Sequence, residues 1–200
     1  GAKPKGRTVT PVNQVVTPVG THLTLPGMRP QALALSPDGT LLVVAGKTHS
    51  IVVIEAATAR ILQQVVLPAE AQEEQHPEVV SPMILEPDEE GQLSYTGLIF
   101  APDGRRIYMS NVDGSIKVFA VDPDGTVEPS HTIHLPPAGA PRRAEEIPSG
   151  LALSEDGRRL FVCGNLSNRL LEIDAATGTE RRAFDVGVAP FDVVLAAGKA

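Results

Sequence analysis

Short apolar runs alternate with polar turns along almost the whole chain, and their order repeats. Residues 151–178 read LALSEDGRRLFVCGNLSNRLLEIDAATG, which is an apolar run, an acidic turn, a second apolar run, a polar loop and a third apolar run. Residues 32–59 and 97–125 show the same order, and a fourth copy begins at residue 188. The repetition predicts that one supersecondary unit is used several times.

The spacing of the copies and the chemistry of their turns favour short antiparallel strands. Pro148 and Pro190, which open two successive copies, lie 42 positions apart, and a period of about 40 to 45 residues built from short strands is typical of a propeller blade. In the turn 36–39, SPDG, proline presets φ, aspartate can bond its own backbone, and glycine accepts the left-handed conformation. The turns APDG and SEDG of the later copies repeat this chemistry.

The central run of each copy is apolar at successive positions, as in LLVVAG, RIYMSN and RLFVCG. Such a run indicates a strand that is covered on both faces. No window predicts a convincing amphipathic helix that could provide the cover, and 18 prolines and 18 glycines interrupt the chain. Sheet must therefore cover sheet, as when blades stack around an axis.

We predict an all-β fold, a β-propeller of four-stranded antiparallel blades with an incomplete set of about three blades and partial first and last blades. Within one domain of residues 1–200, the blade units are 28–68, 94–135 and 147–187, the insertions are 69–94 and 136–147, and the partial blades are 8–27 and 188–200. The expected strands are 31–36, 41–46, 51–55 and 61–67, then 96–101, 106–110, 115–121 and 127–135, then 149–154, 159–164, 169–174 and 180–186. A ring needs at least about four blades, so we expect further blades or an associated domain as partners.

The repeats resemble the bacterial YVTN-type, lactonase-like β-propeller repeats. LALSPDGTLLVVAGKTHSIVVIEAATARIL (33–62), GLALSEDGRRLFVCGNLSNRLLEIDAATGTE (150–180) and FDVGVAPFDVVL (184–195) follow the family pattern, although the four-residue signature is changed to FVCG and YMSN. The segment 17–39, TPVGTHLTLPGMRPQALALSPDG, is similar to the opening of bacterial proteins that join such a propeller to a C-terminal phosphoesterase domain of the alkaline-phosphatase superfamily. The segment 111–127 is similar to the lactonase pattern. WD40 repeats are disfavoured because the chain has no Trp and no Gly-His entry pair.

Composition excludes several functions. The formal net charge is −7 and arginines are scattered, so nucleic acid is not expected as a partner. No apolar run approaches the ~18 residues that span a bilayer. The five histidines are dispersed and His131 and His134, three apart on a strand, point to opposite faces, so we expect no metal and no cofactor. The single cysteine, Cys163, is read as a buried hydrophobe. We expect a periplasmic or extracellular location.

Candidate binding residues lie where propeller sites usually form, at the mouth of the central channel. The loops that enter first strands and join second to third strands supply Arg29, the hairpins 47–49, 111–113 and 165–169, and the entry residues Tyr95, Ser149, Phe191 and Asp192. The same polar residues would also suit a solvated hairpin. The acidic insertion 69–94 is expected on the same rim as the basic pair of the second insertion. We name as ligand or partner candidates Arg29, His49, Asn111, Asp113, Asn165, Arg142 and Arg143.

Three functions remain open. The first is a non-catalytic module that binds a small-molecule or protein ligand. The second is a lactonase-like hydrolase, which requires paired carboxylates or a perturbed histidine in the channel. The third is a scaffold for a phosphoesterase domain. No nucleophile elbow, P-loop or dinucleotide fingerprint occurs, so we assign no catalytic residue and favour the first.

Overall fold

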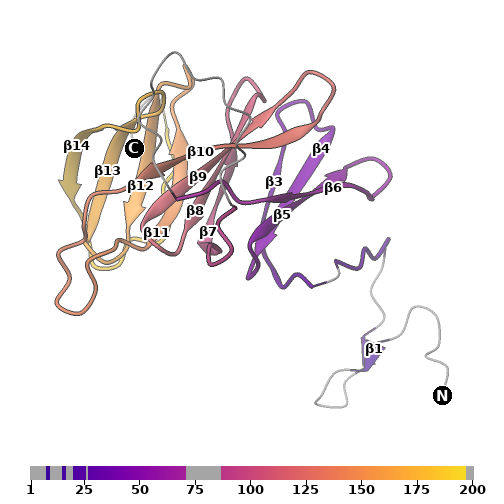
Figure 1. Cartoon of the computed structure of the whole chain (residues 1–200), viewed down its shortest axis with the longest axis horizontal. Coiled ribbons are helices and arrows are strands. Elements are labelled where there is room, and N and C mark those ends of the chain that lie inside the picture. Colours follow the sequence, from indigo (N-terminus) through magenta and orange to yellow (C-terminus); the bar gives the residue numbers. More distant parts are fainter. Residues whose placement is uncertain (1–7, 10–14, 17–19, 26, 71–86, 197–200) are drawn as a thin grey trace.

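Three four-stranded antiparallel sheets lie side by side in the computed structural model of the chain (Figure 1). The structure describes residues 8–9, 15–16, 20–25, 27–70 and 87–196. Each sheet is a meander whose strands follow one another in sequence. The strands are β3 (Pro30–Leu35), β4 (Leu41–Gly46), β5 (Ser50–Glu55) and β6 (Arg60–Val66); β7 (Leu93–Phe100), β8 (Arg106–Asn111), β9 (Ser115–Val121) and β10 (Val127–His134); and β11 (Pro148–Leu153), β12 (Arg159–Gly164), β13 (Arg169–Asp174) and β14 (Glu180–Asp185).

The all-β prediction is confirmed, and no residue within the described ranges is helical. Those ranges accordingly contain no helix of the length and apolarity needed to cross a membrane. Two short strands, β1 (Thr8–Val9) and β2 (Val15–Val16), pair in a separate antiparallel ribbon where the first partial blade was expected. The observed bounds differ from the predicted ones by at most one residue, except at the start of β7.

Each sheet covers the faces of its neighbours, as the continuous apolar runs predicted. In β8, Ile107 and Met109 pack against the first sheet, whereas Tyr108 packs against the third. The strand β9 divides in the same way, with Phe119 on one side and Val118 on the other. All five side chains are almost completely buried. The middle sheet therefore contributes to two separate cores.

The acidic turns hold the first two strands of a sheet together. Ser36 Oγ donates to Asp38 Oδ1 (2.6 Å) and accepts the Leu41 N–H (2.9 Å), while Gly39 takes a φ of 74°. The hydroxyl of Ser36, followed by the Thr40 N–H and hydroxyl, lowers the pKa of Asp38. The aspartate of this turn is therefore explained by turn geometry.

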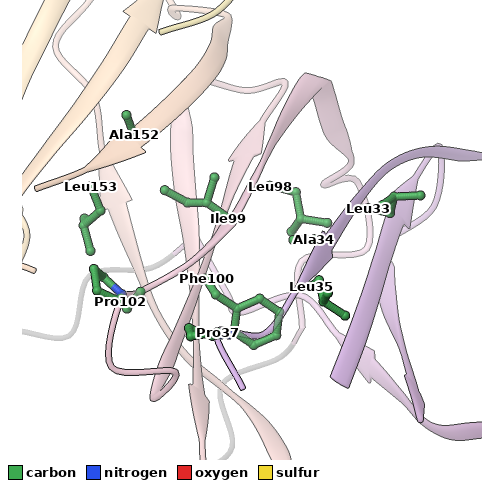
Figure 2. Close-up of a pocket in the computed structure, with 11 residues that line it drawn as sticks. Leu33, Ala34, Leu35, Pro37, Leu98, Ile99, Phe100, Pro102, Ala152 and Leu153 are labelled. Atoms are coloured by element: carbon green, nitrogen blue, oxygen red, sulfur yellow. The ribbon is translucent and has the colours of Figure 1, made fainter. Parts of the chain in front are cut away.

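The first strands β3, β7 and β11 lie next to one another on the inner side of the three sheets. Their final residues line an apolar groove of about 330 Å³ (Figure 2). Leu33 and Leu35 stand on one side of this groove, 68% and 55% exposed, with Phe100 and Leu153 facing it from the other strands. The groove lies at the end of the first strands opposite their starts.

The start of β7 departs from the predicted boundary, because the strand begins at Leu93 rather than at residue 96. Leu93 pairs with Asn111 and the next pair is Leu98 with Met109, so four residues of β7 lie opposite Ser110 alone. In β3 and β11 one or two residues occupy the corresponding position. A wide bulge of this kind bends the strand and redirects its side chains. The repeat pattern gave no indication of it.

Serine hydroxyls join β7 and β8 to β11, and β11 to the segment after β14, across a very close approach. Ser110 Oγ donates to the Ser149 carbonyl (2.7 Å), Ser94 Oγ donates to the Pro148 carbonyl, and Ser149 Oγ donates to the Pro190 carbonyl (2.7 Å). A Cβ at Gly97 would lie 2.0 Å from Ser110 Oγ and 2.1 Å from the Ser149 carbonyl oxygen. The absence of a side chain at Gly97 therefore sets how closely the second and third sheets approach.

Gly97→Ala is expected to destabilise the fold by about 1–3 kcal/mol, the usual range for overpacking a tight interior contact. The new methyl group collides with a backbone oxygen that cannot rotate away. Chemical denaturation followed by circular dichroism measures the change. Gly187→Ala is the control, because nothing lies within 4 Å of a Cβ at Gly187. Equal stability of the two variants would contradict the close-approach argument.

Candidate functional site

The loops at the starts of the first strands and the hairpins β4–β5, β8–β9 and β12–β13 meet at one end of the sheets, here called the entry rim. The pairing of first and second strands shows this arrangement, because Pro30 pairs with Gly46, Leu93 with Asn111, and Pro148 with Gly164. The start of each first strand thus lies beside the end of the second strand. Most of the residues predicted as binding candidates lie on or beside this rim.

Two of the predicted residues, Asp113 and Arg143, are brought together. Arg143 Nη2 donates to the Val112 carbonyl (2.6 Å) and contacts Asp113 Oδ1 at 3.2 Å. Its Nε donates to the carbonyl of Glu145 (3.3 Å). The second insertion is therefore fastened to the β8–β9 hairpin by one arginine. The described ends of the acidic insertion, Glu70 and Asp88, contact Lys117 and not this arginine. Residues 71–86 of the insertion lie outside the described residues.

Asn111 is buried and serves the framework of the rim. Its Oδ1 accepts the Gln92 N–H (2.9 Å), and its Nδ2 donates to Glu70 Oε1 (2.9 Å) and Ser115 Oγ (3.0 Å). The side chain has no exposed surface. Asn111 thus connects β8 to both ends of the first insertion, and a ligand cannot reach it without displacing these partners.

The remaining predicted residues are spread along the rim. Arg29 and His49 are exposed and their carbonyl oxygens accept the N–H groups of Lys47 (3.2 Å) and Leu67 (3.1 Å). Arg142 is exposed. Asn165 receives the Tyr95 hydroxyl at its Oδ1 (3.2 Å). The seven candidates therefore do not form one cluster, since only Asn111, Asp113 and Arg143 belong to the same hairpin region.

A buried lysine, absent from the predicted set, holds the two ends of the first insertion together. Lys117 on β9 is fully buried, and its Nζ lies 2.7 Å from the Pro68 carbonyl, 2.8 Å from Glu70 Oε1 and 2.9 Å from Asp88 Oδ2. The Asp88 contact is an ion pair rather than an aligned hydrogen bond. Glu70 and Asp88 stand immediately before and shortly after residues 71–86. Lys117 therefore fixes where this insertion leaves and rejoins the rim.

The charge of Lys117 determines the ionisation of Asp88. Burial raises the pKa of this carboxyl, but Lys117 and the N–H groups of Gly91 and Glu90 lower it by more, so its pKa lies below the ordinary aspartate value. A depressed pKa stabilises the fold above the ordinary value, and this stabilisation is lost as the pH falls through the folded-state pKa. The Lys117 cluster is thus an acid-sensitive anchor.

A second buried charge, Glu146, organises the β12–β13 hairpin. The side chain is 1% exposed. Its Oε1 accepts the N–H groups of Ile147 (2.9 Å) and Leu166 (2.8 Å), and its Oε2 accepts that of Ser167 (3.3 Å). The carboxylate thus accepts N–H groups of the hairpin loop that have no backbone carbonyl as partner. It thereby shapes the loop that carries Asn165.

Two aromatic rings stand exposed at the rim. Tyr95 lies in the bulge of β7 with a φ of 53°, in the left-handed region that side chains other than glycine seldom adopt. Such a conformation costs on the order of 1–3 kcal/mol and is retained where surrounding contacts impose it. The Tyr95 ring meets the edge of Phe191 at a centroid distance of 5.5 Å and an interplanar angle of 76°.

In the part of the chain that the structure describes, Cys163 and the histidines do not form a reactive group. Burial, followed by the nearby charge of Asp192, raises the pKa of Cys163 to about 11, so the thiol is protonated at neutral pH. His131 contacts Ser130 and His134 contacts Glu70. Among the described residues no three His, Cys, Asp or Glu side chains gather as metal ligands would.

Sequence reasoning therefore missed Lys117, Glu146 and the pairing of Tyr95 with Phe191. A signal for Lys117 was present in SIKVFAV, where a lysine interrupts a strand that must be covered on both faces. Glu146 lies in an insertion that was interpreted only through its arginines. Tyr95 and Phe191 were recognised separately as entry residues, but their contact joins positions far apart in the sequence.

Comparison with known proteins shows the fold. No protein-family model matches the chain, and no curated protein sequence matches it. Solved structures that it resembles include the periplasmic gluconolactonase PpgL of Pseudomonas aeruginosa, with 22% identity, a TM-score of 0.58 and coverage of 84% of this chain and 43% of that one. The WD40 repeats of RRP9 give 16% identity, a TM-score of 0.57 and coverage of 82% and 41%. Hydrazine synthase of Kuenenia stuttgartiensis gives 20% identity, a TM-score of 0.57 and coverage of 87% of this chain and 41% of that one.

These likenesses, together with the three face-to-face sheets, define the chain as three blades of a β-propeller. The chain spans about two fifths of the length of the three structures named above. At these identities the comparisons establish the architecture. The likeness extends to a WD40 protein although the sequence lacks the WD40 signature residues.

Lys117→Met is expected to destabilise the fold by about 3 kcal/mol, because removing one partner of a buried ion pair leaves carboxylates without a counter-charge. The deficit should shrink as the pH is lowered, since without Lys117 burial is opposed only by the N–H groups of Gly91 and Glu90, the pKa of Asp88 rises, and protonation removes the buried charge. Denaturation curves at neutral and acidic pH measure both effects. Lys47→Met, at an exposed position of the β4–β5 hairpin, should change stability by less than about 0.5 kcal/mol. A deficit that did not vary with pH would contradict the ion-pair assignment.

Glu146→Gln is expected to destabilise the protein by about 1–3 kcal/mol, the range for an unsatisfied buried polar group. The glutamine retains one acceptor oxygen, but its amide NH₂ faces backbone N–H donors. Glu145→Gln, which changes an adjacent carboxylate that is 59% exposed, is the matched control. Hydrogen exchange at residues 165–168 should accelerate only in the Glu146 variant. Equal exchange in both variants would contradict the role assigned to Glu146.

Proposed function

We propose that this chain is a non-catalytic binding scaffold in a bacterial YVTN-type propeller protein, and that its entry rim presents the ligand or partner site. The proposal rests mainly on one observation. The buried polar side chains of the rim bind the protein's own backbone and one another, and so build a fixed wall. Asn111, Glu146 and Ser149 all belong to this framework.

The groups that hydrolysis would need are engaged in this framework. The hydroxyls of Ser94 and Ser110 donate to carbonyl oxygens of β11, and that of Ser149 donates to a carbonyl oxygen of the segment after β14. Activation of a serine requires a neighbouring base within hydrogen-bond reach. Glu146 accepts three backbone N–H groups, and Cys163 is protonated and buried. The serines and Glu146 would have to break structural hydrogen bonds before they could react, and Cys163 would have to be exposed and deprotonated.

The exposed apolar surface supports further blades as one partner. Leu33 and Leu35 alternate along β3 with Ala32 and Ala34, which pack against the first core, and they remain 68% and 55% exposed on the other face of the first sheet. Leu25 and Met28 cover only the part of this face formed by Val44, Val52 and Ile54. We propose that another blade completes the cover. The resemblance of residues 17–39 to propeller–phosphoesterase proteins supports an associated domain as a second partner, in a periplasmic or extracellular setting.

The protein with its complete set of blades, but without any downstream domain, is expected to hydrolyse neither lactones nor phosphate esters above the buffer rate. Alanine substitutions at Arg29, His49, Asn111, Asp113, Asn165, Arg142 and Arg143 provide the test. Turnover by the propeller that one of these substitutions abolishes would overturn the proposal in favour of a lactonase-like enzyme. Turnover that requires an added phosphoesterase domain would agree with a scaffold.

A further inference from the structure

The entry rim carries an exposed aromatic corner formed by Tyr95, Phe191 and Asn165. The two rings are 40% and 53% exposed and nearly perpendicular, at an interplanar angle of 76°. The Tyr95 hydroxyl donates to Asn165 Oδ1 at 3.2 Å. The three residues come from the start of β7, the β12–β13 hairpin and the segment after β14. The corner therefore forms only when the blades are assembled.

Hydrogen bonds fix the segment that carries Phe191. Ser149 Oγ and Asn165 Nδ2 donate to the Pro190 carbonyl at 2.7 Å and 3.3 Å. The Gly150 N–H donates to the Phe191 carbonyl at 2.9 Å. A site that is ordered before binding loses less conformational entropy when a ligand arrives. The Phe191 side chain is thus exposed while hydrogen bonds fix its backbone.

Tyr95 is held in place in a similar way. Its left-handed backbone, in a bulge with more residues than the corresponding parts of β3 and β11, directs the ring onto the rim. Strained residues and bulges concentrate at functional sites, where surrounding contacts maintain them. Exposed aromatic side chains with a few placed polar groups are the usual lining of a ligand site.

We propose that the aromatic corner binds a neutral pyranose unit of a glycan. The apolar C–H face of a pyranose packs on an aromatic ring, and its hydroxyls both donate and accept hydrogen bonds. The Tyr95 oxygen can still accept, and the second Asn165 N–H can donate, so both roles are available. The net charge of −7 disfavours an anionic ligand.

The geometry of the rings separates this ligand from a proline-rich peptide. An extended polyproline segment docks along a groove lined by aromatic residues. Two rings at 76° to one another form a corner instead of a continuous slot. A compact, non-planar ring can contact both aromatic surfaces of a corner at once. The arrangement therefore favours a sugar ring.

The inference rests on the proposed binding function and is tested by titrating neutral oligosaccharides, namely cellohexaose, maltohexaose and chitohexaose, into the purified protein. Tyrosine fluorescence is a direct readout, because the chain has two tyrosines and no Trp, and Tyr108 is fully buried. We expect one of these oligosaccharides to change the Tyr95 emission in a saturable manner. Isothermal titration calorimetry gives the affinity independently of Tyr95.

Phe191→Ala and Tyr95→Ala are expected to weaken binding by about tenfold or more, as loss of an aromatic contact usually does. Tyr95→Phe keeps the ring and should have a smaller effect. Phe184→Ala is the matched control, because Phe184 on β14 is also exposed, at 41%, and contacts Arg182 outside the corner. Circular dichroism verifies that each variant is folded.

The inference is overturned if none of the three saccharides binds, or if Phe184→Ala weakens binding as much as Phe191→Ala. Binding of a decaproline peptide with the same dependence on Tyr95 and Phe191, in place of a saccharide, would also overturn it. Absence of both binding and turnover removes the sugar inference but leaves the scaffold function intact. Hydrolysis of a bound saccharide would instead contradict the non-catalytic function.

Discussion

The contact between neighbouring sheets supplies the burial on which the other features of this structure depend. A strand such as β8 places Ile107 and Met109 in one core and Tyr108 in another, so neither of its faces is available for polar side chains. Chemistry is therefore confined to strand ends and loops. Lys117 and Glu172 are exceptions among the described residues, because two carboxylates and a carbonyl surround Lys117 inside the sheet stack and Arg182 pairs with Glu172. The outermost strand β14 is exposed throughout, and its Arg181, Arg182 and Asp185 form ion pairs with the neighbouring strand β13.

Much of the fold could be predicted from the sequence, because its turns are local. The SPDG turn uses a side chain, a backbone N–H and a left-handed glycine that all lie within six residues. The repeat of this chemistry located eleven of the twelve blade strands to within one residue at each end, and only the start of β7 differs by more. The period of about 42 residues and the continuous apolar runs predicted that these sheets stack as propeller blades.

The candidate site was less predictable, because its contacts connect residues far apart along the chain. Lys117 meets carboxylates from positions 70 and 88, and Arg143 meets the hairpin at 112–113. The sequence indicated that polar residues such as Asn111 and Asn165 would reach the entry rim. It could not indicate that the Asn111 side chain would be buried in hydrogen bonds to the protein itself, whereas Tyr95 and Phe191 would stay exposed. Burial and exposure at the rim depend on which loop covers which, and that is decided by the assembled blades.

The bulge of β7 and the identity of Asn111 have a common physical origin. At the equivalent position of the first blade, a Cβ on Gly46 would lie 2.0 Å from the Arg29 carbonyl oxygen, so only glycine fits beside the start of β3. The second blade has Asn111 at this position, opposite Leu93, and its side chain needs space that an unbulged strand does not leave. The additional residues of β7 create this space, and Asn111 Oδ1 then accepts the Gln92 N–H. The same residues carry Tyr95 outward in a left-handed conformation. The presence of asparagine, where the first and third blades have glycine, thus goes together with the bulge that exposes Tyr95.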